Sequence, residues 1–351
     1  MTFESIARTI PGWIVGEGPE SGIVISSRTR LARNLSGVFY VHRADDDTLA
    51  EVVMSILDAA LTAGFSEKNF FYINNLSDLQ KSVFIERHLI SPALASNVGN
   101  RGVLVRDTEI SSVMVNEEDH LRIQSMRHGF DLMGSFVEAV EIEDRLSHDL
   151  TFSSSDEYGY LTACPTNMGT GLRASVLIHL PALVLTKEIE RVIRSSGQLG
   201  MAVRGYRGEG SDVIGNLFQI SNQKSFGKSD TDIVRDLVKV VKQIIDYEKK
   251  AADMLMNEAR YQIEDKIFRS IGILKSARIL STHEFMNLAS AVRLGLHLGL
   301  LKKPGVMTLN ELLILTQPGH IQEILGKRLE PLERDRLRAE RVRERFIDVG
   351  A

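Results

Sequence analysis

Residues 26–34 have the sequence Ser26-Ser27-Arg28-Thr29-Arg30-Leu31-Ala32-Arg33-Asn34, and this stretch decides the fold that we expect. It continues the apolar run Gly22-Ile-Val-Ile-Ser26, which predicts a strand. Side chains alternate between the two faces of a strand, so Arg28 and Arg30 lie on one face. A planar guanidinium offers a fork of donors that matches phosphate oxygens. The stretch therefore predicts a strand that carries part of a polyanion site.

Three more segments combine arginines with acidic or flexible residues. They are Asn116-Glu117-Glu118-Asp119-His120-Leu121-Arg122, Cys164-Pro-Thr-Asn-Met-Gly-Thr-Gly-Leu-Arg-Ala-Ser175 and Arg204-Gly205-Tyr206-Arg207-Gly208-Glu209-Gly210. A triphosphate would satisfy the arginines, and the carboxylates would then face the acceptor of the phosphate. The last segment contains three glycines, so it could close over a ligand. The leading interpretation is a nucleotide-dependent phosphotransferase.

The composition of the 351 residues is that of a globular protein with room for two or more cores, since domains usually run to ~100–200 residues. A formal charge of −4 argues against a general nucleic-acid binder. Cys164 is the only cysteine, which favours a reducing compartment. We see no secretory signal and no apolar run of the ~20 residues that a membrane span needs. We therefore expect a cytoplasmic protein that does not bind membranes.

The order of elements predicts an α+β fold, in which a mainly antiparallel sheet is flanked by helices and followed by an all-helical region. We expect an N-terminal leader over 1–20, a catalytic domain over 21–250 and a helical domain over 251–351, with the boundary inside 245–260. The strands expected after residue 26 cover 102–106, 112–116, 158–163, 174–180, 201–205 and 216–221. Helices are expected over 52–61, 132–146 and 187–195, and from residue 229 onward.

Helix starts are indicated where a serine or threonine stands three residues before an acid. This capping spacing occurs at Ser229 with Asp232, Ser281 with Glu284 and Thr308 with Glu311.

Several known site types are missing from the sequence. It has no Gly-x-x-x-x-Gly-Lys-Ser/Thr loop and lacks the protein-kinase set of a Gly-rich loop, HRD and DFG. No histidine or cysteine spacing predicts a metal site, and we interpret His120, His128 and His179 as structural. If the chain transfers phosphate, it does so on another scaffold.

The four ordered segments SSRTRLARN, NEEDHLR, CPTNMGTGLRASV and RGYRGEG resemble the signatures of the ATP:guanidino phosphotransferases, the arginine and creatine kinase superfamily. The resemblance covers about residues 20–250. It implies that ATP and Mg²⁺ are used and that the phosphate passes directly to a guanidinium. The nucleotide contacts that it implies are Ser26, Ser27, Arg28, Thr29, Arg30, His88, Arg122, Arg173, Ala174, Ser175, Val176, Leu177, Arg204, Gly205, Tyr206, Arg207 and Gly208.

The resemblance also implies three catalytic residues, Glu118, Glu209 and Cys164. A guanidinium has a pKa above about 12 and no free lone pair, so it is a poor nucleophile at neutral pH. Two flanking carboxylates, on Glu118 and Glu209, could align its nitrogens and help to remove a proton. The Cys164 thiolate would lie near the cationic acceptor, with Thr166 donating to the sulfur. Which glutamate acts as the base stays open.

The ends of the chain separate the members of the superfamily. Small-molecule kinases carry an N-terminal helical domain, whereas here the first motif begins at Ser26 and helical residues follow the catalytic region. This order resembles the bacterial protein-arginine kinases. The segment Arg334-Asp335-Arg336-Leu337-Arg338-Ala339 matches the RDxxRA motif that implies allosteric binding of phosphoarginine. An ordinary solvated helix with i,i+4 charge pairs is the alternative.

We expect a protein-arginine kinase whose products mark proteins for stress-response regulation and proteolysis. The partners that this implies are a heat-shock repressor and unfolded proteins as substrates, an activator protein, a Clp-type protease and a second copy in a homodimer. A kinase for free arginine or a small guanidine is one alternative, and a phosphoarginine-binding regulator is another. The presence of Glu118, Glu209 and Cys164 argues against the regulator, because a protein that only binds phosphoarginine needs no catalytic residues.

Overall fold

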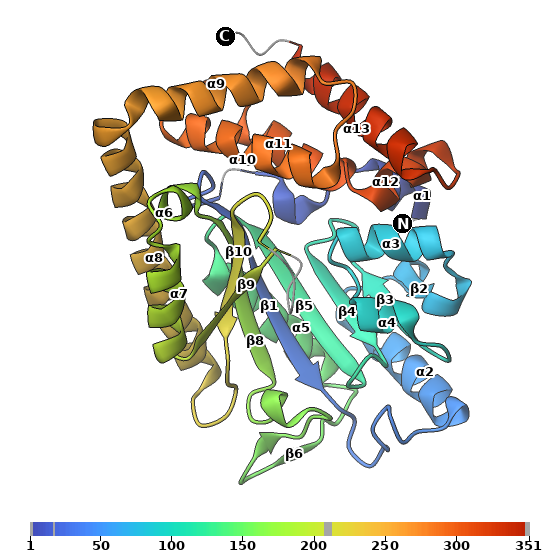
Figure 1. The fold of residues 1–351 in the computed structure, drawn as a ribbon. Coiled ribbons are helices and arrows are strands. Elements are labelled where there is room, and N and C mark those ends of the chain that lie inside the picture. The colour runs from blue at the N-terminus through green and yellow to red at the C-terminus, as the bar shows by residue number, and fades with distance from the viewer. Residues whose placement is uncertain (1–2, 17, 207–212, 348–351) are drawn as a thin grey trace.

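The computed structural model describes residues 3–16, 18–206 and 213–347. Its main feature is an antiparallel sheet of eight strands, which confirms the predicted α+β class (Figure 1). In spatial order the strands are β2 (Phe70–Tyr72), β3 (Gly102–Val105), β4 (Ser111–Val115), β5 (Leu121–His128), β1 (Val24–Arg33), β8 (Leu172–His179), β10 (Leu217–Asn222) and β9 (Met201–Gly205). A separate two-stranded ribbon pairs β6 (Ser154–Ser155) with β7 (Gly159–Tyr160).

The arginine-bearing strand β1 lies in the middle of this sheet, between β5 and β8. Arg30 is in register with Gln124 on one side and Arg173 on the other. Residues in register across antiparallel strands project from the same face. The pairing therefore gathers polar side chains from three strands onto one face of the sheet.

The opposite face of the sheet is covered by α2 (Asp46–Thr62), α5 (Leu132–Leu146) and α8 (Asp230–Glu258) (Figure 1). Thr29 points to this face, and its hydroxyl hydrogen-bonds Ser135 of α5 at 2.8 Å. Leu31 is fully buried in the same core. Successive residues of β1 thus alternate between the arginine face and the hydrophobic core, as the sequence predicts.

The remaining helices extend the molecule at both sides of the sheet. Those before residue 230 are α1 (Phe3–Arg8), α3 (Asp78–Glu86), α4 (Pro92–Ser96), α6 (Pro181–Leu185) and α7 (Ile189–Gln198), with single 3₁₀ turns at Gly12–Ile14, Glu67–Asn69, Ile73–Asn75 and Pro165–Asn167. Those after α8 are α9 (Arg260–Ser276), α10 (Thr282–His297), α11 (Val306–Leu315), α12 (Pro318–Leu325) and α13 (Pro331–Phe346). None of the described helices is both long and apolar enough to cross a membrane.

The C-terminal helices lie across one end of the sheet (Figure 1), and a second hydrophobic core joins α9, α10, α11 and α13 to it. Ile25 of β1 and Trp13 of the first 3₁₀ turn are buried in it together with residues such as Phe285 and Ile314. Helix α1 contacts α12. Residues 3–14, which we expected to form a leader, therefore pack between the sheet and the C-terminal helices.

Two of the three predicted helix caps are present in the structure. Ser229 and Ser281 each accept a hydrogen bond from the backbone N–H three residues later, at 3.2 and 3.1 Å, so both caps are confirmed. The cap at Thr308 is wrong, because α11 begins at Val306 after Gly305 and Thr308 lies inside its first turn.

The strand expected over 158–163 is also wrong in extent, since only Gly159–Tyr160 is a strand. Beyond it, the Ala163 N–H donates to the Asp119 side chain at 2.6 Å instead of to a strand partner. The hairpin of 102–106 with 112–116 and the helix over 132–146 are confirmed as β3–β4 and α5.

Candidate active site

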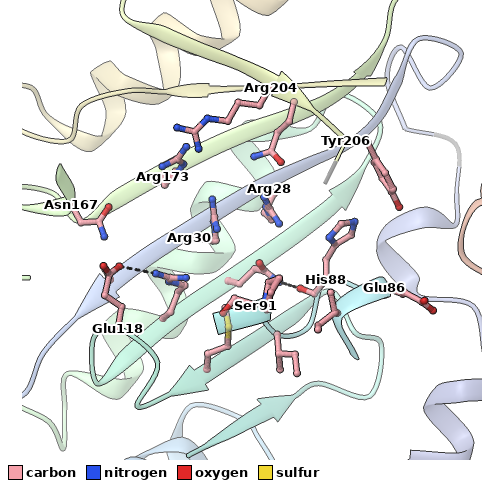
Figure 2. Close-up of a pocket in the computed structure, with 18 of the residues that line it drawn as sticks. Arg28, Arg30, Glu86, His88, Ser91, Glu118, Asn167, Arg173, Arg204 and Tyr206 are labelled. Atoms are coloured by element: carbon pink, nitrogen blue, oxygen red, sulfur yellow. Dashed lines mark hydrogen bonds and ion pairs between the residues drawn. The ribbon is translucent and has the colours of Figure 1, made fainter. Parts of the chain in front are cut away.

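A cavity of about 720 Å³ lies on the arginine face of the sheet, which is within the ~300–1,000 Å³ typical of ligand sites (Figure 2). Strands β1, β5, β8 and β9, the end of α3 and the turn before β5 all contribute side chains to it. The predicted site residues that line it are Arg28, Arg30, His88, Glu118, Arg122, Cys164, Arg173, Arg204 and Tyr206. The structure therefore brings together residues that are up to 178 positions apart in the sequence.

Arg28 and Arg30 form the floor of this cavity without carboxylate partners among the described residues. Arg28 Nε donates only to Ser175 Oγ, at 3.4 Å, and Arg30 Nε is buried with no hydrogen-bond partner in the described part of the chain. Burial, together with the charges of Arg173 and Arg122, lowers the pKa of Arg28 to about 10. The pKa of Arg30 is lowered well below its usual value, first by burial and then by the other arginines. Such a group of like charges is stabilised by a bound polyanion.

The acidic turn between β4 and β5 supplies one candidate base. Glu118 projects into the cavity and forms an ion pair with Arg122 at 3.3 Å. Burial raises the pKa of Glu118, and the carboxylates of Asp119 and Glu117 raise it further, whereas Arg122 and a hydrogen bond with Cys164 oppose the shift. A carboxylate with a raised pKa accepts a proton more readily.

The other acids of this turn have structural partners. Glu117 is buried, forms an ion pair with Arg122 at 2.8 Å and accepts a hydrogen bond from Ser91 at 2.5 Å. Asp119 accepts a hydrogen bond from the side chain of Asn34 at 2.6 Å. These contacts favour a structural role for Glu117 and Asp119.

Cys164 lies beside Glu118 at the edge of the cavity. Its Sγ is 3.0 Å from the hydroxyl oxygen of Thr166, which confirms the contact that the resemblance implied. The thiol is partly exposed, so a ligand in the cavity can reach it.

His88 follows α3 and has a left-handed backbone with φ of 59°. This conformation is uncommon for a residue with a side chain and is held here by the surroundings. Gln124 donates to the His88 carbonyl at 2.8 Å, and the ring lies between Trp13 and Tyr206 at centroid distances of 5.5 and 5.8 Å. Burial and the charges of Arg28 and Arg30 lower the pKa of His88 to about 3. Its imidazole is therefore neutral at physiological pH.

Some predicted nucleotide contacts need correction. The side chains of Ser27, Thr29, Ala174 and Val176 point into the core on the opposite face, so they offer no side-chain contact to the cavity. The residues next to them along each strand point to the opposite side of the sheet, toward the cavity. Ser26, Ser175 and Leu177 line a small adjoining cavity of about 20 Å³ together with Arg28, His88 and Tyr206. Gly205 ends β9, where it pairs with Phe218. Arg207, Gly208 and Glu209 lie outside the described residues.

Several cavity residues were missed at the level of sequence. They include Glu86, Ser91, Gln124, Asn167, Gln219, Gln317 and Pro318. Gln124 stands two residues after Arg122 on β5, so strand alternation could have found it. Gln317 and Pro318 come from the C-terminal helical region, and no local pattern links them to the arginine strand.

The side chains at the site fit a Mg²⁺ ion whose ligands come mainly from the phosphates of the nucleotide. No cluster of three or more His, Cys, Asp and Glu side chains within the described ranges could hold a metal ion. Mg²⁺ commonly keeps several waters and is bound through one or two carboxylates and the substrate phosphates. Glu117 and Glu118 both form ion pairs with Arg122, which belongs to the arginine row of the cavity (Arg28, Arg30, Arg122, Arg173 and Arg204).

The RDxxRA segment lies on α13, away from this cavity. Arg338 and Ala339 are buried, and Arg338 donates to the carbonyls of Thr316 and Leu280 at 2.9 and 2.8 Å. Arg336 is exposed and pairs with Glu340 at 3.7 Å, which is an ordinary i,i+4 surface pair. Part of the motif therefore stabilises the helical region.

The structure resembles solved phosphagen kinases. A lombricine kinase is 26% identical, with a TM-score of 0.57 over 69% of this chain and 70% of its own. A duplicated taurocyamine kinase from Schistosoma mansoni, 21% identical, shares the fold with a TM-score of 0.58 over 78% of this chain and 40% of its own. Residues 49–251 match the ATP:guanido phosphotransferase C-terminal catalytic domain. The chain belongs to the ATP:guanido phosphotransferase family.

Within that family, the full length of the chain is similar to the protein-arginine kinases. Residues 260–351 match the protein-arginine kinase McsB C-terminal domain. The protein-arginine kinase of Halothermothrix orenii is 43% identical over 97% of this chain and 98% of its own length. That of Bacillus subtilis is 42% identical over 97% and 94%.

Proposed function

We propose that this chain is a protein-arginine kinase, which transfers the γ-phosphate of ATP to the guanidinium of arginine side chains in other proteins. The observation that carries the proposal is a cavity lined by Glu118 and Cys164 together with five arginines, Arg28, Arg30, Arg122, Arg173 and Arg204. The similarity of both parts of the chain to protein-arginine kinases supports a protein as the acceptor.

The arginine row would act on the phosphate side of the reaction. Phosphoryl transfer depends mainly on positioning and on neutralisation of the developing charge. Arg30 Nε has no hydrogen-bond partner in the described structure and Arg28 Nε donates only weakly to Ser175, so both side chains have donors available for the phosphates. Mg²⁺ bound with ATP would supply further neutralisation of the phosphate charge.

Glu118 and Cys164 would act on the acceptor side. As the new N–P bond forms, the bond between the γ-phosphorus and the ADP oxygen breaks, and one guanidinium proton leaves. Glu118 would align the acceptor nitrogens and accept that proton, which its raised pKa favours. The Cys164 sulfur would lie against the positive charge of the acceptor. We propose Glu209 as the second carboxylate, on the family motif alone.

The function is tested by incubating the protein with ATP and Mg²⁺ and either casein or free arginine, followed by an assay of acid-labile phosphate. Label on casein alone is expected. Label on free arginine alone would replace this proposal with a small-guanidine kinase, and label on neither would leave a phosphoarginine-binding regulator. Glu118→Gln should reduce labelling by ~10²–10⁴-fold while ATP still binds. Glu188→Gln, at an exposed glutamate of a surface pair, is the matched control.

Finer proposals concern the partners and the regulation. We propose that a heat-shock repressor and unfolded proteins are its substrates in the cytoplasm. We also propose that the chain forms a homodimer and works with an activator protein and a Clp-type protease.

We also propose that residues 334–339 bind phosphoarginine. Arg334 is only weakly held, with Nη1 3.5 Å from the Leu329 carbonyl. Arg334→Ala should therefore abolish activation by added phosphoarginine and leave unstimulated labelling intact, whereas Arg269→Ala, at an exposed arginine of a surface pair outside this segment, should change neither. An unaltered response in Arg334→Ala would contradict this proposal.

A further inference from the structure

The C-terminal helical region supplies part of the wall of the ATP cavity. Gln317 and Pro318, at the start of α12, line the cavity together with Glu86 and His88. Neither residue belongs to a motif that the sequence associates with nucleotide binding. The cavity is therefore complete only when α12 is held against the end of α3.

Glu86 makes the contacts that hold α12 there. Its carboxylate accepts hydrogen bonds from the backbone N–H groups of Gly319 and His320, at 2.7 and 3.0 Å, and a third contact from His320 Nδ1 at 2.8 Å. A carboxylate at this position satisfies free N–H groups in the first turn of a helix and complements its dipole. Figure 2 shows Glu86 pointing away from the arginine row, on the far side of His88. Glu86 is thus placed to bind α12 and not phosphate.

Buried hydrogen bonds and an ion pair surround this contact. His320 is buried, which lowers its pKa, so the neutral ring can donate from Nδ1 to Glu86 and accept at Nε2 from Arg87, 3.3 Å away. Arg87 is fully buried and pairs with Glu109 through two nitrogens. On the other side of Pro318, the Thr316 carbonyl accepts from Arg338 at 2.9 Å. Residues 316–320 are therefore anchored at both ends.

We propose that Glu86 is a positioning residue for the nucleotide: by fixing the first turn of α12 it places Gln317 and Pro318 in the cavity wall and holds the backbone that presents His88. This inference rests on the proposed ATP site. Since Glu86 acts through α12, its loss should weaken ATP binding more than it slows the transfer of phosphate from bound ATP.

The test compares Glu86→Ala with Asp78→Ala. Both residues join α3 to the C-terminal region, but Asp78 does so through an exposed ion pair with Arg328, away from the cavity. Hydrogen bonds to a charged group are stronger than neutral ones, so Glu86→Ala should raise the KM and Kd for ATP at least about fivefold, with kcat changed less than about twofold. Asp78→Ala should change neither constant. Glu86→Gln keeps one acceptor oxygen and should give an intermediate KM.

Gly319→Ala disturbs the same contact from the side of α12 and does not replace Glu86 itself. A Cβ at Gly319 would lie 2.8 Å from a carboxylate oxygen of Glu86, so the carboxylate would have to move. The KM for ATP should rise in this variant too. An unchanged KM in both Glu86→Ala and Gly319→Ala, in protein that labels casein normally, would overturn the inference and leave the proposed function intact. Calorimetric Kd values for ATP test the inference even if neither casein nor free arginine is labelled.

Discussion

The catalytic region contains arginines with a carboxylate partner and arginines without one among the described residues, and the contrast between them locates the function. Arg33 pairs with Glu143 at 2.5 Å and stacks over the ring of Tyr160 at 3.5 Å, and Arg87 is paired with Glu109. Arg28 and Arg30 stand on the same strand as Arg33 and have no carboxylate partner among the described residues. The first kind of arginine is neutralised by the fold, and the second kind is not.

The difference shows what an arginine must meet in order to be structural. A buried charge is costly unless a partner of opposite charge accompanies it. Arg33 lies on the core face of β1, where α5 supplies Glu143. Arg30 lies on the opposite face, where it lines the cavity and its neighbours in register are Gln124 and Arg173. The charge missing around Arg30 is the charge that the phosphates of ATP would bring.

The largest expected effect is on catalysis, from Arg30→Gln. Because an arginine that stabilises the transition state of phosphoryl transfer contributes ~10³–10⁵ in rate, labelling of casein should fall by about that factor. The melting temperature should not fall, since the substitution removes a charge that has no carboxylate partner in the described structure. Activity assays and thermal melts check both points. A large loss of thermal stability would show that Arg30, like Arg33, has a structural role, and would contradict the contrast between them.

The opposite pattern is expected for Arg33→Gln. This change leaves Glu143 as an unpaired buried carboxylate, so the free energy of unfolding should fall by ~3–5 kcal/mol. The midpoint of urea unfolding measures this loss. At a temperature where the variant is folded, its Kd for ATP should equal that of the unchanged protein, because Arg33 does not line the cavity. A weakened Kd without a loss of stability would contradict the assignment.

A smaller effect reports on the uncompensated charge itself, through His88. The pKa of His88 is about 3 in the folded protein, against an ordinary value of 6.5, because of burial and the charges of Arg28 and Arg30. In the unfolded chain His88 therefore binds a proton below about pH 6.5, whereas in the folded protein it stays neutral until the pH approaches 3. The stability contributed by His88 is present in full above pH 6.5 and is lost as the pH falls toward 3.

Two measurements test this interpretation of His88. His88→Gln should flatten the decline in the urea midpoint between pH 6.5 and the acid limit of the folded protein. Bound ATP brings negative charge to Arg28 and Arg30, so an NMR titration of the ring should show that the pKa of His88 rises when ATP is added. A pKa that stays the same would mean that the nucleotide phosphates do not lie near these arginines.

The sequence predicted the central part of the site well, because strand alternation is a local property. It placed Arg28 and Arg30 on one face, and the four motifs led to Arg122, Arg173, Arg204 and Glu118, all of which line the cavity. The same alternation should have excluded the side chains of Thr29 and Val176, which the motif match carried along. A motif marks a segment, whereas only the face of the strand decides which of its residues meet a ligand.

By itself, the sequence determined the α+β class, the strand that carries the arginines and the family to which the chain belongs. These follow from periodicity and ordered motifs, which neighbouring residues fix. Only the tertiary structure decided that Arg33 is neutralised and Arg30 is not, and that Glu86 binds the first turn of α12 beside the cavity. The physical reason is that the fate of a charge depends on what lies opposite it in space, and those partners come from segments 110 and 233 residues away.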